Sequence, residues 1–89
     1  MIPDKYQTNF YSSKRGEIVK FSINDSAEII SGTLKGIGCA VISIEQIEPE
    51  VILLVERGDN GASLKVKQTE LQMLALYDFK SKTWEDTSK

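Results

Sequence analysis

The chain has 89 residues, with 11 basic and 13 acidic side chains, a net charge of −2, one cysteine and no histidine. This composition excludes an internal disulfide and the usual zinc ligand sets, and it gives no overall attraction to nucleic acid or anionic lipid. A domain this short buries only about 60% of its unfolded surface, and without a disulfide or a metal the remaining common means of stabilisation is oligomerisation.

The beginning of the chain predicts a short helix. Pro3 suits a first helical position, and Ile2, Tyr6 and Phe10 recur every four residues, which places them on one helical face. Residues 1–5 lack the apolar core of a signal peptide, and no stretch of about 18 apolar residues follows. We therefore expect a soluble, cytoplasmic protein without a membrane partner.

Residues 18–23 predict the first strand. Val19, Phe21 and Ile23 alternate with their neighbours, a period of two that gives the strand one apolar face. Residues 24–26 predict a turn, because Asn and Asp side chains bond to their own backbone and tolerate left-handed geometry.

The next two predicted strands span residues 27–35 and 40–47. Glycine inside a strand pattern marks a sharp bend, so we expect the sheet to bend at Gly32. Gly36 and Gly38 break the pattern between the two strands.

Two apolar strands, over residues 51–56 and 71–77, indicate an interface between copies of the chain. Residues 51–55 form an unbroken apolar run, which predicts a strand covered on both faces, whereas one small barrel covers only one. Apolar strands with free edges would aggregate, so we expect both to meet a second copy head to tail and close a ring. The expected interface residues are Val51, Leu53, Val55, Met73, Leu74 and Leu76.

The rest of the chain completes one domain. Residues 58–61 predict a tight hairpin turn, residues 62–67 a further strand, and residues 68–70 a single helical turn. Residues 80–89 are mostly polar and predict a fraying tail, which limits the domain to residues 1–79.

Apolar residues surround a central glycine between positions 19 and 37. The residues concerned are Val19, Phe21, Ile23, Ile30, Gly32, Leu34, Lys35, Gly36 and Ile37. This spacing resembles the first motif of the Sm-like family, the ring-forming proteins that include the spliceosomal Sm cores. The family's second motif, an apolar residue followed by Arg-Gly, resembles residues 55–58, where Glu56 interrupts it. The resemblance covers about residues 3–77.

The resemblance implies an all-β fold, a small, strongly bent, five-stranded barrel of the SH3-like or Sm-like type. It also implies a ring of about five to seven copies with RNA bound around the pore. Candidate RNA contacts are Arg57, Gly58 and Lys35, because a guanidinium can reach a phosphate or stack on a base. The family's RNA-contacting aspartate and asparagine are replaced here by Gly38 and Ile42, and acidic residues flank Arg57.

Several features have two interpretations. Basic and aromatic side chains interleave over residues 5–15, which fits either a nucleic-acid surface or a helix packing Tyr6 and Phe10 on the barrel. Cys39 fits a small buried hydrophobe better than a nucleophile, since no histidine is present to activate it. Trp84 is either incidental or an anchor for a partner.

Two functions remain open. The first is a homo-oligomeric Sm-like ring that acts as a binding or scaffolding module, with RNA as a candidate partner. The alternative is a structural or protein-interaction SH3-like barrel without nucleic acid, which the mildly acidic net charge favours. Residues 45–59 carry five acidic side chains and one basic, so a polyanion should avoid this part of the chain. No catalytic group, cofactor or small-molecule substrate is predicted, because neither a phosphate-binding glycine loop nor a tuned carboxylate pair is evident.

Overall fold

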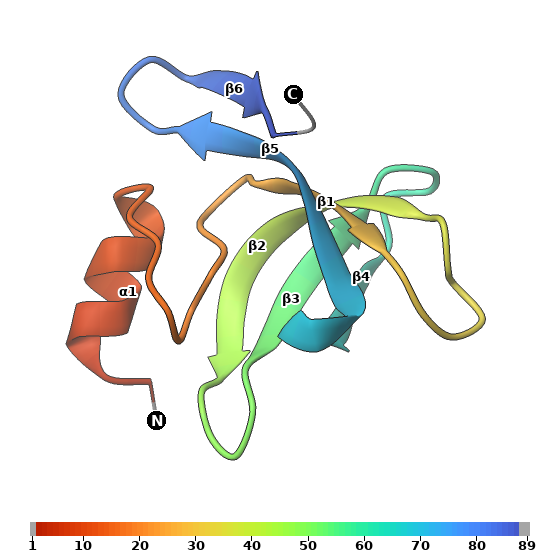
Figure 1. Cartoon of the computed structure of the whole chain (residues 1–89), viewed down its shortest axis with the longest axis horizontal. Helices are drawn as coiled ribbons and strands as arrows, with labels where there is room; N and C mark the ends of the chain where they lie inside the picture. Colours follow the sequence, from red (N-terminus) through yellow and green to blue (C-terminus); the bar gives the residue numbers. More distant parts are fainter. Residues whose placement is uncertain (1, 88–89) are drawn as a thin grey trace.

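The structure is a computed structural model that describes residues 2–87, and it begins with a short helix, α1 (Asp4–Tyr11) (Figure 1). Pro3 stands immediately before this helix, and the Phe10 side chain is buried in the core. The predicted N-terminal helix is therefore confirmed. Over residues 2–87, no helix combines the length and apolarity needed to cross a membrane.

Within residues 2–87, six antiparallel strands follow this helix, and together they form one unclosed sheet. The sheet order is β4-β3-β2-β1-β5-β6, and a 3-10 turn, η1 (Gln68–Glu70), joins β4 to β5. The strands are β1 (Ser26–Ile29), β2 (Gly38–Gln46), β3 (Ile52–Arg57), β4 (Ser63–Lys67), β5 (Leu71–Asp78) and β6 (Thr83–Asp86). The all-β class is confirmed, as are the strands predicted at 40–47, 51–56, 62–67 and 71–77 and the helical turn at 68–70.

The sheet curves mainly through β2, the longest strand (Figure 1). Its register against β3 shifts twice, between Val41 and Ser43 and between Ile44 and Gln46. Such bulges bend a strand and change which side chains face inward, so Val41 and Ile44 are both buried although they are three residues apart.

The core explains the apolar run of residues 51–55 without a second copy. Val51, Leu53 and Val55 are buried inside the single chain, at 9%, 0% and 0% exposed. Strand β3 is paired with β2 on one edge and with β4 on the other, so both of its edges are occupied within the single chain. These three side chains therefore contribute almost nothing to the exposed surface of the single chain.

The opposite face of β3 has lysine residues of β4 as its cross-strand neighbours. Leu54 pairs with Lys65 and Ile52 pairs with Lys67 across the two strands. The Lys65 ammonium lies 3.5 Å from the carboxylate of Glu45, and Lys67 makes an equivalent contact with Glu50. Long lysine stems cover apolar surface while their charged ends stay in water, which leaves Ile52 and Leu54 half-buried.

The second predicted interface strand, β5, is also largely occupied by its own chain. It pairs with β1 along one edge, and from Ala75 to Asp78 its other edge pairs with β6. Met73 packs against the core, Leu76 is half-buried, and Leu74 is 37% exposed. Of the six predicted interface residues, Leu74 alone is an exposed large hydrophobic side chain.

The structure differs from the predicted elements in three places. Residues 18–23 form no strand, strand β1 ends at Ile29, and Gly32 lies in the following turn at φ +80° rather than inside a bent strand. Within the predicted polar tail, residues 83–86 form β6 and pair with β5. The last two residues of the predicted tail, 88 and 89, lie outside the described chain.

Candidate functional site

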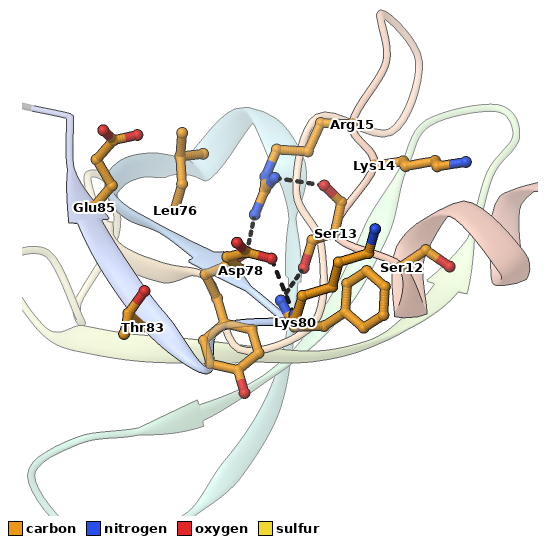
Figure 2. A pocket seen from close by; sticks show the side chains of 11 residues that line it. Ser12, Ser13, Lys14, Arg15, Leu76, Asp78, Lys80, Thr83 and Glu85 are labelled. Atoms are coloured by element: carbon orange, nitrogen blue, oxygen red, sulfur yellow. Dashed lines mark hydrogen bonds between the residues drawn. The ribbon is translucent and has the colours of Figure 1, made fainter.

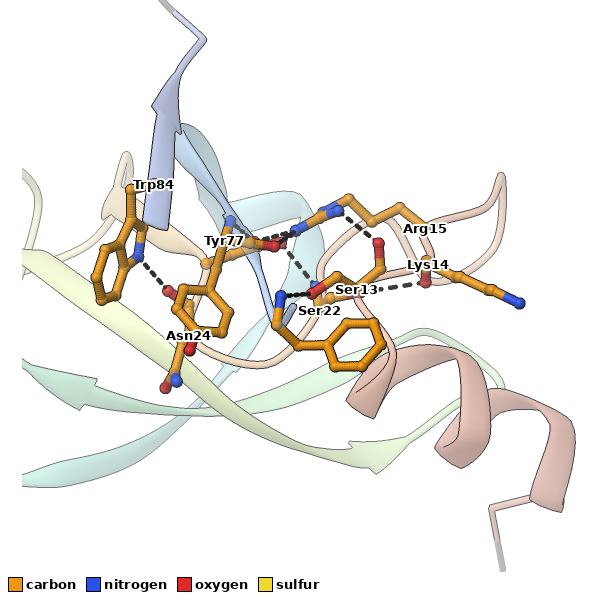
Figure 3. Close-up of polar contacts among 9 residues, drawn as sticks. Ser13, Lys14, Arg15, Ser22, Asn24, Tyr77 and Trp84 are labelled. Atoms are coloured by element: carbon orange, nitrogen blue, oxygen red, sulfur yellow. Dashed lines mark hydrogen bonds and ion pairs between the residues drawn. The ribbon is translucent and has the colours of Figure 1, made fainter. Parts of the chain in front are cut away.

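A buried carboxylate organises the region between α1 and the β5–β6 hairpin (Figure 3). Asp25 is 0% exposed, and its Oδ2 accepts hydrogen bonds from Arg15 Nε at 2.9 Å and from the Ser22 N–H at 2.7 Å. Its Oδ1 accepts one from Arg15 Nη2 and one from the Tyr77 N–H at 2.9 Å. We call these four residues the Asp25 network.

The Arg15 guanidinium extends this network to two backbone carbonyls. Nη1 donates to Ser13 O at 2.9 Å and Nη2 donates to Tyr77 O at 3.0 Å. Planar guanidinium groups match a carboxylate with two parallel hydrogen bonds, which fixes orientation as well as charge. The network thus ties the segment after α1 to strand β5 and positions Tyr77.

Trp84 on β6 is held rigidly and yet remains 55% exposed. Its indole N–H donates to Asn24 O at 2.8 Å, and its ring centroid lies 4.8 Å from that of Tyr77, its cross-strand partner. Figure 3 shows Trp84 at one end of these contacts, beside Asn24 and Tyr77. An aromatic side chain fixed on two sides presents its surface with little further loss of conformational freedom.

Beside Trp84, a hollow of about 480 Å³ opens on the sheet surface; we call it the Trp84 hollow. It is lined by Asn24, Ser26, Gly38, Cys39, Ala40, Glu56, Arg57, Gly58, Asp59 and Trp84. At one side the Gly58 N–H donates to Gly38 O at 2.8 Å, and a Cβ on Gly58 would lie only 3.2 Å from that oxygen. Glycine therefore allows the close approach that shapes the hollow.

Three polar side chains in the hollow are unengaged. The Asn24 amide, the Ser26 hydroxyl and the Glu56 carboxylate have no hydrogen bond or ion pair with any residue of the described chain. They come from the turn before β1, from β1 and from β3. An aromatic surface with a few convergent polar groups is the usual composition of a binding site.

Two of the three predicted RNA contacts line this hollow. Arg57 and Gly58 do so, whereas Lys35 lies in the exposed turn between β1 and β2 and does not. Arg57 donates to both carboxylate oxygens of Asp59, from Nε at 2.9 Å and from Nη2 at 2.6 Å. This hydrogen bonding lowers the pKa of Asp59 and raises the pKa of Arg57, so the two charges largely cancel.

A larger groove of about 690 Å³ lies between residues 12–15 and the β5–β6 hairpin (Figure 2). Many of its polar groups are already bonded to one another. Arg15 belongs to the Asp25 network, the Ser13 hydroxyl accepts the Phe79 N–H at 3.0 Å, and Asp78 accepts the Lys80 N–H at 3.0 Å. These bonds hold two parts of the chain together, so the groove has a structural role and the Trp84 hollow is the better candidate site.

Cys39 forms part of the core, with 6% of its surface exposed. Burial raises the pKa of its thiol, which disfavours the reactive thiolate. The prediction of a small buried hydrophobe is confirmed. Within residues 2–87, no three carboxylate, thiol or imidazole side chains come together in a way that could hold a metal ion.

The sequence left Trp84 open as either incidental or an anchor for a partner, and it did not identify Asp25 as a buried charge. Trp84 stands in a polar stretch, and its contacts reach back 60 residues to Asn24. Arg15 and Asp25 are ten residues apart in a region without regular structure, so no periodic signal links them. No family model, curated protein or solved structure matches the chain.

Proposed function

We propose that the chain is a protein-interaction module, an SH3-like five-stranded barrel with β6 added at its edge, which binds a polypeptide segment of a partner protein in the Trp84 hollow. The observation that carries this proposal is the exposed, immobilised indole of Trp84 beside three unengaged polar side chains. Tryptophan is strongly enriched among residues that dominate interface energies. A rigid indole also loses little conformational entropy on binding.

The charge of the hollow favours a polypeptide over a nucleic acid. Glu56 and Asp59 carry two negative charges against one positive charge on Arg57. Because Asp59 already binds Arg57, the unpaired charge is that of Glu56. A negative hollow repels phosphate at short range, and the net charge of −2 does not offset this.

Peptide selection tests the proposal directly. A displayed library of random peptides is selected on the wild-type chain, and the enriched peptides are measured against Trp84→Ala and Tyr11→Ala. Tyr11 is a matched control because it is an exposed aromatic residue on α1, outside the hollow. We expect binding to wild type and Tyr11→Ala and at least a tenfold loss for Trp84→Ala, provided that circular dichroism shows all three folded. Failure to enrich any peptide, or equal binding to Trp84→Ala, would refute the module.

A homo-oligomeric Sm-like ring is the second candidate, and one observation favours it. The outer edges of β4 and β6 have no strand partner within residues 2–87, and two different free edges can pair head to tail. Light scattering separates the candidates, because the module predicts the single-chain mass of 10.0 kDa and the ring predicts several times that value.

RNA binding is a separate property of the ring candidate. It predicts that affinity for a U-rich or A-rich oligonucleotide falls with salt, with a slope of roughly 0.7 per phosphate contacted. It also predicts weaker binding for Lys35→Ala and Arg57→Ala, whereas the module predicts no saturable binding at physiological salt.

A further inference from the structure

We infer that the Trp84 hollow receives an arginine side chain of the partner segment, an inference that rests on the proposed function. The hollow combines an exposed aromatic surface, an unpaired carboxylate and two further polar side chains. Each of these features selects for one property of the ligand.

The first property is a flat shape. The indole N–H of Trp84 is bound to Asn24 O, and Tyr77 packs against the ring at an interplanar angle of 54°. Because the indole N–H is hydrogen-bonded and Tyr77 packs beside the ring, the part of the indole that remains exposed suits a group that stacks on an aromatic surface. A guanidinium is planar and stacks on aromatic faces, whereas an ammonium is a compact, strongly hydrated point charge.

The second property is an excess of hydrogen-bond donors. The Glu56 carboxylate only accepts hydrogen bonds, and the Ser26 hydroxyl and the Asn24 amide oxygen also accept them. All three belong to side chains without a partner in the described chain. A guanidinium offers five N–H donors and no acceptor, so it satisfies a site of this composition better than a carboxylate, a hydroxyl or an amide does.

The third property is a positive charge. Arg57 is occupied by Asp59, which leaves the negative charge of Glu56 without a counterion in the hollow. A cationic ligand supplies that counterion, and a charge-assisted hydrogen bond is roughly twice as strong as a neutral one. A phosphorylated or acidic segment would instead place like charges together.

A set of matched peptides tests this inference. The probe is a blocked pentapeptide, Gly-Gly-Xaa-Gly-Gly, in which the central residue is arginine, lysine or citrulline. Citrulline keeps the planar shape of arginine and removes its charge. Binding is followed by the fluorescence of Trp84, the single tryptophan of the chain, and by the amide resonances of Ser26, Ala40 and Gly58.

We expect saturable binding of the arginine peptide, with at least about tenfold weaker binding of the lysine and citrulline peptides. Glu56→Gln should weaken binding of the arginine peptide by about tenfold. Glu17→Gln, which alters an exposed carboxylate outside the hollow, should leave the affinity for the arginine peptide unchanged. Equal binding of arginine and citrulline, indifference to Glu56→Gln, or no response to the arginine peptide would overturn the inference.

The failure of this inference is distinguishable from the failure of the proposed function. If the selected library peptides require Trp84 and lack arginine, the module stands and the arginine pocket is wrong. If no peptide requires Trp84, the proposed function fails and the inference falls with it. If the selected peptides share an arginine whose replacement by citrulline abolishes binding, both are supported.

Discussion

The Asp25→Ala variant gives the sharpest test of how the fold is held together. The substitution removes four hydrogen bonds at once, two from the Arg15 guanidinium and two from the backbone N–H groups of Ser22 and Tyr77. It also leaves the Arg15 charge without its counterion, and that side chain is only 20% exposed. Removing one partner of a buried pair is costly because the other charge remains buried.

The expected magnitude follows from these contacts. Breaking a buried ion pair on one side typically costs about 3–5 kcal/mol, and partial access of Arg15 to water favours the lower end. The two N–H groups that lose their acceptor would each cost about 1–3 kcal/mol if no water replaced the carboxylate. Water that enters the vacated space reduces this cost. We therefore expect a loss of about 3–4 kcal/mol in the free energy of unfolding, a large part of the total of about 4–13 kcal/mol for a domain of this size.

Urea denaturation followed by Trp84 fluorescence and by circular dichroism measures this loss. For an m-value of about 1–1.5 kcal/mol/M, the midpoint should fall by at least about 2 M. Asp59→Ala is the control, since the Asp59 carboxylate is 45% exposed whereas Asp25 is fully buried, and its midpoint should move by less than about 0.5 M. Equal midpoints for the two variants would refute the structural role of the Asp25 network. A double variant, Arg15→Ala with Asp25→Ala, should lose less than the sum of the single losses.

Three further predictions concern other parts of the chain. The Asp59 carboxyl should titrate below its usual pKa of 3.8 by carbon NMR, and Arg57→Ala should raise that pKa because it removes the largest cause of the shift. Because the folded pKa is lowered, the stabilisation by this pair is present at neutral pH and is lost as pH falls through the folded pKa. Iodoacetamide should alkylate Cys39 at least about a hundredfold more slowly in the native state than in urea, since the thiol is buried and its pKa is raised; equal rates would place it at the surface. Ending the chain after Lys80 should expose the edge of β5 and raise the mass seen by light scattering, whereas an unchanged monomer would show that β6 protects nothing.

Local patterns predicted most of the strands because their hydrogen-bond partners are near in sequence. The turn at residues 58–61 is an example, since the Gly61 N–H donates to Arg57 O at 3.0 Å and Gly61 adopts φ +75°. The turn at residues 24–26 was also predicted for the right physical reason, because Asn24 has φ +63° and Asp25 bonds back to the Ser22 N–H.

The alternation of apolar and polar residues led to a wrong prediction of a strand at residues 18–23. Val19 and Phe21 are both buried, so the alternation correctly indicated an extended segment with one face toward the core. A strand also requires a partner backbone, and here the Lys20 N–H donates to the Gln68 side chain while the Ile23 N–H donates to Phe10 O. The pattern specifies which side chains are buried but cannot specify which groups their backbone will bond.

The candidate site depends on contacts that no local pattern encodes. Arg57 and Gly58 were selected because they resemble the Arg-Gly of the Sm-like second motif, whereas Trp84, Ser26 and Glu56 meet only after the sheet has formed. Lys35 was grouped with Arg57 through the Sm-like resemblance, and it lies in a different turn outside the hollow.

The covering of β5 shows why an apolar strand need not imply a second copy. Pairing with β6 closes a loop of only residues 79–82, and the entropic cost of closing a short loop is small and grows slowly with length. Pairing with another chain costs an estimated 4–15 kcal/mol in lost translational and rotational freedom before any contact is counted. The contacts of Trp84 with Tyr77 and Asn24 further stabilise the intramolecular hairpin. Oligomerisation through residues 75–78 of β5 would therefore have to displace β6, which is already bound there, and within residues 2–87 the two ends of the sheet that a partner strand could extend are β4 and β6.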